Sequence, residues 1–176
     1  RGQIRTAHTG ASMATAATVV ATARKYADQG YKEGPNNDTI FGKWYGLNNQ
    51  PWCAMFVSKC FDEAGIVNLV AASSKKGFAS CNAGYQWFAK NGQIVPIGQA
   101  QAGDIVFFNF DENAKTTEHV GIVVSYDSTK HILTTIEGNT GGEGKGGSQA
   151  NGDGVYLRHR PVTLVMGIAR PKYPSI

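Results

Sequence analysis

Apolar positions in the first half of the chain follow the period of an α-helix. They recur at helical spacing over residues 14–29, where Gly30 supplies a C-terminal stop, and again over residues 53–64, where Gly65 ends the pattern. The residues between these segments, 30–50, are rich in Gly, Asn and aromatic side chains, which is typical of an ordered loop. The pattern therefore predicts two amphipathic helices joined by a loop.

Capping residues predict where the later helices begin and end. Asn49 is a candidate N-cap for the second helix, and Pro51 suits its first turn, because the N–H that proline lacks would be unpaired there. A third, short helix is predicted over residues 82–90, with Asn82 as its N-cap and Gly92 after its end. All three helices precede the first strand-like segment.

The second half of the chain has the composition of β-strands. Five segments are rich in β-branched and aromatic residues and are separated by turn residues: 103–110, 119–126, 131–137, 154–160 and 164–170. Helices followed by successive strands indicate an α+β domain with an antiparallel sheet. The Gly-rich stretch 138–154 precedes a strand rather than a helix, so we expect a mobile connection and not a phosphate-binding loop.

Length and composition fit one globular domain. The chain has 176 residues, of which 41% are hydrophobic and 17% charged, and no apolar run is long enough for a membrane helix. Residues 1–12 are polar and lack periodicity, and Met13 follows them. We interpret 1–12 as a linker or an expression scar and 13–176 as the folded domain. The N-terminal segment also lacks the layout of a secretory signal.

The net charge does not point to nucleic acid. The formal charge is +4 and the pI about 9.0, but lysines and arginines are scattered along the chain. A protein that binds nucleic acid usually concentrates its basic residues on one helix or face. We expect a solvated basic surface, which could also attract an anionic polymer.

Three cysteines offer thiol chemistry without a metal-binding motif. The odd number leaves at least one thiol unpaired, and no Cys-x-x-Cys, His-Glu-x-x-His or Cys/His cluster occurs, so a zinc site is not expected. Cys53 and Cys60 would lie two turns apart on one helix, about 10 Å along its axis, which is too far for a disulfide. Cys60 fits a core position, and Cys81, in a polar turn, is assigned no role.

Cys53 occupies the first turn of its predicted helix. Core filling is the common role of a cysteine on an apolar helix face. At a helix start, however, unpaired N–H groups and the helix dipole stabilise a thiolate, and the same N–H groups could hold the oxyanion of a tetrahedral intermediate. A nucleophile gains from both effects, whereas a core cysteine gains from neither.

A cysteine nucleophile needs a general base. His119 opens a strand, and Gly121, two residues on, shares its face and leaves space beside the ring. His131 is expected at the solvated end of a hairpin, and His159 lies between two arginines that disfavour its charged form. His119 is therefore the preferred base, with an ordinary surface histidine as the alternative.

The base needs an orienting group, and the strand predicted over 131–137 supplies candidates. Glu137 ends that strand, and Asn139 follows it by two residues. Antiparallel pairing with the strand that begins at His119 would bring Glu137 near the imidazole, where a carboxylate or carboxamide could accept the ring N–H and fix its tautomer. A surface glutamate would satisfy the same spacing.

Four short motifs, taken together, resemble the CHAP domain, the cysteine, histidine-dependent amidohydrolase/peptidase family. They are Trp52-Cys53 at a helix start, "GDIVFF" at 103–108, "HVGIV" at 119–123 and "EGN" at 137–139. The resemblance covers residues 14–173. It implies a papain-like α+β fold, with N-terminal helices packed on a C-terminal antiparallel sheet, and hydrolysis of an amide bond in bacterial peptidoglycan.

The resemblance also implies roles for individual residues. Cys53 would be the nucleophile, His119 the general base and Glu137 the orienting residue, and Asn139 matches an asparagine that often follows. The substrate groove could be lined by three aromatic residues, for which core packing is the alternative: Trp44, Tyr45 and Trp52.

Further expectations concern ligands and setting. Some CHAP domains bind calcium in an acidic loop before the cysteine, but the matching loop here has few carboxylates; Asp38 is a weak calcium candidate, and no cofactor is expected to be required. The expected partner is bacterial peptidoglycan, not nucleic acid or a membrane, bound by a monomer that could be joined to a wall-binding domain outside this sequence. The motif around Cys53 is closest to phage endolysins and tail-associated lysins, which a holin releases or the virion carries to the wall.

Other functions stay open at this stage. A catalytically inactive wall-binding module or a structural phage protein could use the same fold, although the joint presence of Cys53, His119 and Glu137 favours an enzyme. A related family of wall peptidases has a second histidine in the place of Glu137, and "EGN" argues against it. The scissile bond is also open: an N-acetylmuramoyl-L-alanine amidase would cut the muramoyl-alanine amide, and an endopeptidase a stem-peptide cross-bridge.

Overall fold

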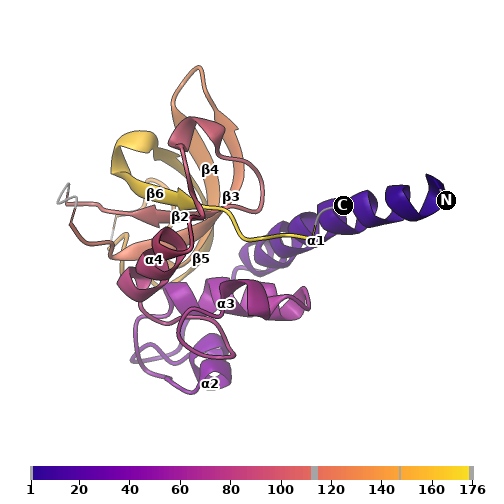
Figure 1. Ribbon diagram of the computed structural model, residues 1–176. Helices are drawn as coiled ribbons and strands as arrows, with labels where there is room; N and C mark the ends of the chain where they lie inside the picture. The colour runs from indigo at the N-terminus through magenta and orange to yellow at the C-terminus, as the bar shows by residue number, and fades with distance from the viewer. Residues whose placement is uncertain (1, 112–114, 147, 175–176) are drawn as a thin grey trace.

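The computed structural model describes residues 2–111, 115–146 and 148–174, and it begins with helices, as the sequence predicts (Figure 1). The α-helices are α1 (Gly2–Asp28), α2 (Ile40–Tyr45), α3 (Cys53–Glu63) and α4 (Cys81–Lys90), and 3₁₀ turns lie at Val67–Val70, Ile97–Gln99 and Val162–Leu164. α1 begins earlier than predicted, because residues 2–12 continue the helix. α2 interrupts the predicted loop; at six residues it is too short to show a helical period.

Both predicted N-caps are wrong, although the helices themselves are present. The N-cap of α3 is Trp52, whose side chain makes no capping hydrogen bond, while Asn49 lies outside the helix with a φ of 67°. The N-cap of α4 is Ser80, whose side chain accepts a backbone N–H of the first turn. As a result Cys53 is the first helical residue of α3, and Cys81 holds the same position in α4.

The strands form one antiparallel sheet, in the order β1-β6-β2-β3-β4-β5. Its members are β1 (Ile94–Val95), β2 (Ile105–Phe108), β3 (His119–Asp127), β4 (Ile132–Thr140), β5 (Gly154–Pro161) and β6 (Val165–Ala169). The five longer strands coincide with the five predicted segments, whereas the two residues of β1 are too few to show a pattern. The α+β class with an antiparallel sheet is confirmed.

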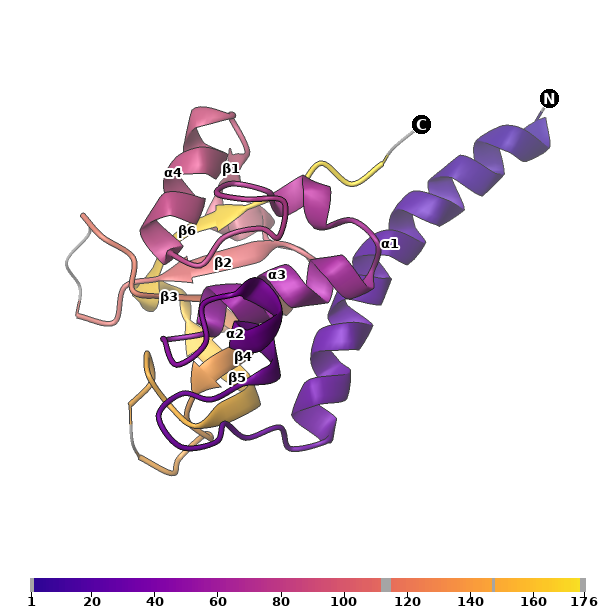
Figure 2. The same cartoon turned by 90° about the horizontal axis from the view of Figure 1, so that it is seen from below.

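Successive side chains of a strand point to opposite faces of the sheet, and they form one apolar cluster on each face. Ile105 and Phe107 belong to the larger core that the helices cover, whereas Val106 and Phe108 belong to a smaller cluster on the other face. α3 packs on β3 and β4, and α1 packs on α3 and β5. Figure 2 shows α2 and α3 in front of the sheet. Directly paired residues share a face, so His119, which pairs with Phe108, lies on the face of the smaller cluster.

A glycine in β4 allows α3 to approach the sheet closely. A Cβ at Gly138 would lie 2.7 Å from Cβ of Phe56 and 2.8 Å from Cζ3 of Trp52, distances that real side chains do not tolerate. Gly138 therefore fixes how near the start of α3 can come to the end of β4. That contact brings Cys53 toward the residues of β4.

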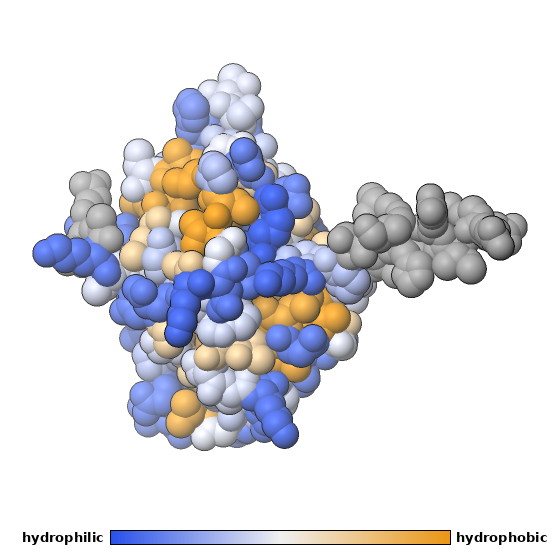
Figure 3. Space-filling model, in the orientation of Figure 1, coloured by the Kyte–Doolittle hydropathy of each residue, from blue (hydrophilic) through white to orange (hydrophobic). Residues whose placement is uncertain are grey.

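The surface is mostly polar. Blue and white residues cover much of the face in Figure 3, with separate apolar areas between them. The large hydrophobic residues identified as exposed in the described part of the chain are Ile40 and Leu47, each about half exposed. Within that same part, no helix combines the length and the apolar character that crossing a membrane requires.

Candidate active site

His119 and Glu137 meet as the sequence predicts. β3 pairs with β4, and Nε2 of His119 lies 2.9 Å from Oε1 of Glu137, with both side chains fully buried. Gly121 makes this possible, because a Cβ there would lie 2.6 Å from Cγ of Glu137. The space predicted beside the imidazole is thus filled by the carboxylate. Nδ1 of His119 has no hydrogen-bond partner among the described residues.

Glu137 is held by two more side chains that the sequence did not single out. Arg160 donates from Nη2 to Oε1 at 2.6 Å and from Nε to Oε2 at 2.9 Å, and Thr135 donates from Oγ1 to Oε2 at 2.5 Å. The guanidinium of Arg160 is buried and lies over the rings of Phe108 and Phe110, 5.6 and 4.8 Å from their centroids. These bonds fix the carboxylate in one orientation.

The charges of this pair stabilise each other. Burial by itself raises the pKa of Glu137, but hydrogen bonds from His119 and Arg160 outweigh it and lower that pKa to about 2. Burial likewise lowers the pKa of His119, but the neighbouring Cys53 and the hydrogen bond to Glu137 outweigh it and raise that pKa to about 9. At neutral pH Glu137 is therefore ionised and His119 carries a proton on both ring nitrogens.

Cys53 is the thiol next to His119 and Glu137 in the candidate active site. Its pKa is well below the ordinary value because the Cys81 thiol hydrogen-bonds to it, because His119 lies next to it and because the N–H of Ala54 points at the sulfur, and these effects together outweigh burial. The last effect comes from the helix start, as the sequence predicts. The lowered pKa of Cys53 and the raised pKa of His119 favour a thiolate–imidazolium pair.

The other two cysteines occupy different environments. Cys60 is buried, and burial raises its pKa, so it is a core thiol as predicted. Cys81 was assigned no role, but its Sγ lies 3.6 Å from Sγ of Cys53. All three thiols are free, in agreement with the prediction that Cys53 and Cys60 are not bonded. No short-range pattern joins two helix starts 28 residues apart, which is why the sequence did not show this contact.

Asn139 is buried near this set but bonds elsewhere. Its backbone is left-handed, with a φ of 57°, at a register shift between β4 and β5. Nδ2 donates to the carbonyl of Ala150 at 3.4 Å, and Oδ1 has no partner among the described residues. Glu137, and not Asn139, therefore accepts the hydrogen bond from His119, and Asn139 bonds to the β4–β5 connection.

The three aromatic groove candidates lie in different places. Trp52 is fully buried, stacks on Phe41 at 5.4 Å and donates from Nε1 to Glu33, so its assignment to a groove is wrong: the apolar core takes the ring. Trp44 is half-buried beneath the ammonium groups of Lys59 and Lys76. Tyr45 packs at the edge of the main core. Contact of Trp44 or Tyr45 with substrate stays a prediction.

Asp38, the weak calcium candidate, does not fit a calcium site. Its carboxylate accepts a hydrogen bond from Nδ2 of Asn48 at 2.7 Å and pairs with Nζ of Lys43 at 3.2 Å, both of which are donors that a metal would have to displace. Those contacts lower its pKa. Across residues 2–111, 115–146 and 148–174 no three His, Cys, Asp or Glu side chains are grouped so that they could hold a metal ion.

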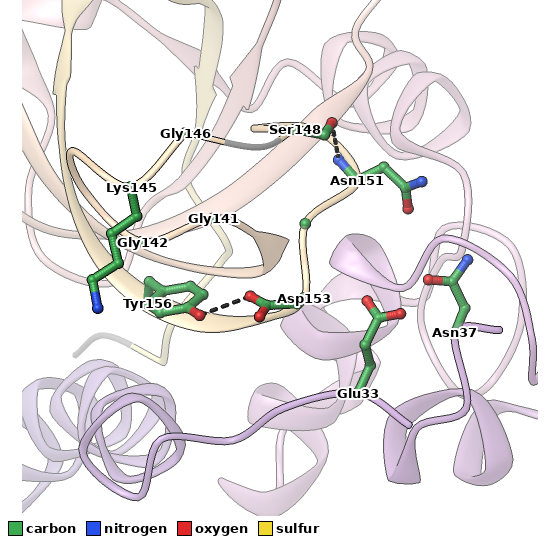
Figure 4. Close-up of a pocket in the computed structure, with 11 residues that line it drawn as sticks. Glu33, Asn37, Gly141, Gly142, Lys145, Gly146, Ser148, Asn151, Asp153 and Tyr156 are labelled. Atoms are coloured by element: carbon green, nitrogen blue, oxygen red, sulfur yellow. Dashed lines mark hydrogen bonds between the residues drawn. The ribbon is translucent and has the colours of Figure 1, made fainter. Parts of the chain in front are cut away.

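A pocket of about 420 Å³ lies between the loop after α1 and the β4–β5 connection (Figure 4). Glu33 and Asn37, from the loop after α1, line one side, and the β4–β5 connection with Lys145 and Asp153 lines the other. Glu33 accepts the indole N–H of Trp52, the residue before Cys53. The β4–β5 connection begins directly after β4, the strand that carries Glu137. Cys53, His119 and Glu137 are not among the residues that line this pocket; its link to them is the contact of Glu33 with Trp52 and the start of the β4–β5 connection.

A thiolate at a helix start and a histidine held by a buried carboxylate on an antiparallel sheet are the parts of a papain-like cysteine hydrolase. Residues 44–139, more than half of the chain, match the CHAP domain model, and the chain belongs to the CHAP domain family. Members are typically cysteine- and histidine-dependent amidohydrolases or peptidases that act on peptidoglycan. No curated protein and no solved structure matches the chain. Cys53, His119, Glu137 and Asn139 fall inside the matched segment, and Arg160 lies outside it.

Replacing Arg160 with glutamine is expected to lower the free energy of unfolding by about 3 kcal/mol, because it removes the strongest partner of a buried carboxylate. Urea unfolding monitored by circular dichroism measures the change. Arg158→Gln is the matched control from the same strand: Arg158 is also buried but bonds the uncharged oxygens of Gly141 and Gln149. An equal decrease in the free energy of unfolding of the two variants would show that the ion pair with Glu137 stabilises the fold no more than the hydrogen bonds of Arg158 do.

The pH dependence of hydrolysis should follow His119. Because its pKa is raised to about 9, the imidazolium persists through neutral pH and is lost above that value, and with it the proton for the leaving amine. We expect kcat/KM to fall on the alkaline side near pH 9. Initial rates between about pH 5 and pH 10 test this, because kcat/KM reports the groups of the free enzyme. A fall centred near the ordinary histidine pKa would contradict the proposed ion pair.

Proposed function

We propose that this chain hydrolyses an amide bond of bacterial peptidoglycan by a Cys–His–Glu mechanism, with Cys53 as nucleophile, His119 as acid and base and Glu137 as orienting residue. The observation that carries the proposal is the buried 2.9 Å contact between His119 and Glu137 next to a thiol whose pKa is lowered. A structural module would gain nothing from keeping three ionisable groups buried in this arrangement, because desolvation makes them costly.

The mechanism begins with the thiolate. Sγ of Cys53 attacks the carbonyl carbon of the scissile amide, and N–H groups in the first turn of α3 stabilise the oxygen that becomes negative. The imidazolium of His119 gives its proton to the nitrogen as the C–N bond breaks, which leaves a thioester on Cys53. Neutral His119 then takes a proton from water, the hydroxide attacks the thioester, and the carboxylic acid leaves as the thiolate reforms.

Glu137 acts through His119 in both steps. Its Oε1 accepts the Nε2 proton, which leaves Nδ1 as the nitrogen that exchanges a proton with sulfur, substrate or water. Arg160 and Thr135 keep the carboxylate from turning away. We propose that part of the substrate occupies the pocket bounded by Glu33 and the β4–β5 connection, where carboxylates of Glu33 and Asp153 and the ammonium of Lys145 could bind charged groups of a wall peptide.

Digestion of purified walls tests this function. We expect the protein to reduce the turbidity of a wall suspension and to release fragments whose masses identify the cleaved bond. A new alanine amine with an intact glycan would identify an amidase. An opened cross-bridge would identify an endopeptidase. Cys53→Ala is the control. Binding of both proteins to the walls without release of fragments would identify an inactive wall-binding module and remove the proposal.

We also propose how the protein reaches the wall and that it acts as a monomer. The motif around Cys53 favours a phage lysin that a holin releases or the virion carries to the wall, acting as a monomer that could be joined to a wall-binding domain. Size-exclusion chromatography with light scattering tests the monomer, and activity against walls of different composition tests which hosts the catalytic domain accepts.

A further inference from the structure

Cys53 and Cys81 form a pair of touching thiols inside the active site. Their sulfur atoms lie 3.6 Å apart, and both are reduced. A disulfide requires about 2.05 Å, so the two sulfur atoms would have to approach by about 1.5 Å. Because the cysteines belong to different helices, no helix holds their sulfurs apart, unlike Cys53 and Cys60 on α3.

The two thiols differ in reactivity. The thiolate is the form that attacks an oxidant, and His119 next to Cys53 favours the thiolate at that residue. At Cys81 the hydrogen bond to Cys53 and burial raise the pKa, so this thiol keeps its proton while Cys53 is ionised. Cys53 and Cys81 keep 4% and 9% of their surface exposed, so the pair is buried but not entirely closed off from solvent.

We propose that Cys53 is also a reversible oxidation site for hydroperoxides and that Cys81 is its resolving cysteine. The proposal rests on the thiolate character of Cys53 in the proposed function. In the first step the Cys53 thiolate attacks the terminal peroxide oxygen, the O–O bond breaks, Cys53 becomes a sulfenic acid and an alcohol or water leaves after protonation. In the second, the Cys81 sulfur attacks the sulfur of Cys53, the S–O bond breaks and water leaves. Two thiols are oxidised to one disulfide, and one hydroperoxide is reduced.

The first step prepares the second. The hydrogen bond to Cys53, burial and the charge of the Cys53 thiolate together hold the proton on Cys81, and oxidation of Cys53 removes the thiolate charge. Cys81 can then ionise more easily, at a sulfur already in contact with its target. The disulfide blocks hydrolysis because the nucleophilic sulfur is used, but it also prevents irreversible oxidation to sulfinic or sulfonic acid. A thiol reductant would restore the enzyme.

Peptide mapping of oxidised protein tests the bond directly. Trypsin cleaves after Lys43, Lys59, Lys75, Lys76 and Lys90 and so places the three cysteines in separate peptides: 44–59, 60–75 and 77–90. After a brief treatment of the folded protein with hydrogen peroxide and alkylation of the remaining thiols, we expect a disulfide between 44–59 and 77–90, with 60–75 alkylated. Absence of that linked pair from oxidised protein would overturn the proposal, whether or not the protein digests walls.

Recovery of activity tests the function of Cys81. After excess peroxide, dithiothreitol should restore most of the lytic activity of the native protein and of Cys60→Ala, the matched control. In Cys81→Ala it should restore almost none, because Cys53 passes to the sulfinic acid. Each protein is compared with its own untreated activity. Equal recovery in Cys81→Ala and the native protein would overturn the resolving role. A native protein that forms the linked peptides but never digests walls would overturn the hydrolase proposal alone.

Discussion

Replacing Cys53 with alanine is expected to abolish wall hydrolysis and leave the fold intact. The substitution removes the atom that bonds to the substrate carbonyl, and neither His119 nor water at that position can replace it, so we expect a loss of at least about 10⁴-fold. The fold should survive because Ala suits the first turn of a helix and only one buried sulfur is lost, at a cost of about 1 kcal/mol. Turbidity of wall suspensions and thermal unfolding measure the two effects.

Cys60→Ala is the matched control for Cys53→Ala. Cys60 lies on the same helix and is fully buried, but its sulfur belongs to the core, and burial raises its pKa. We expect it to lose about 1 kcal/mol of stability, from the missing sulfur, and to keep its activity. Native lysis by Cys53→Ala, or equal loss in both variants, would show that the nucleophile has been misassigned.

Replacing His119 with alanine should have the second largest effect. It removes the group that transfers protons and the positive charge that stabilises the thiolate, and general acid–base catalysis contributes about 10²–10⁴-fold by itself. Glu137 keeps Arg160 as a partner, so the carboxylate is not left unpaired and the protein should stay folded. Alkylation of Cys53 by iodoacetamide near neutral pH should slow as well, because less thiolate is present.

His131 and His159 provide the controls for His119→Ala. His131 is exposed at a hairpin end, as predicted, and His159 is exposed and paired with Glu143 at 2.9 Å. His131→Ala and His159→Ala should therefore lyse walls at close to the native rate and keep the native alkylation rate. If His119→Ala retains both its lysis and its alkylation rate, that histidine has no part in the mechanism.

Local sequence patterns determined the element types and half of the site. The 3.6-residue period placed Cys53 in the first turn of a helix, and the five segments rich in β-branched and aromatic residues became β2 to β6. Gly121 predicted space beside His119, and one antiparallel pairing was enough to connect His119 with Glu137. Each of these inferences needed only neighbours along the chain or across a single strand pair.

The tertiary structure decided what surrounds those residues. Arg160 reaches Glu137 from β5, and Cys81 meets Cys53 from the start of another helix, contacts that depend on how whole elements pack. Trp52 was a groove candidate with core packing as the alternative, and the core takes it, because burial of so large a ring gains free energy. Sequence periodicity records which face of an element is apolar; only packing decides which elements share that face, and here it placed a second thiol and a buried arginine against the predicted catalytic residues.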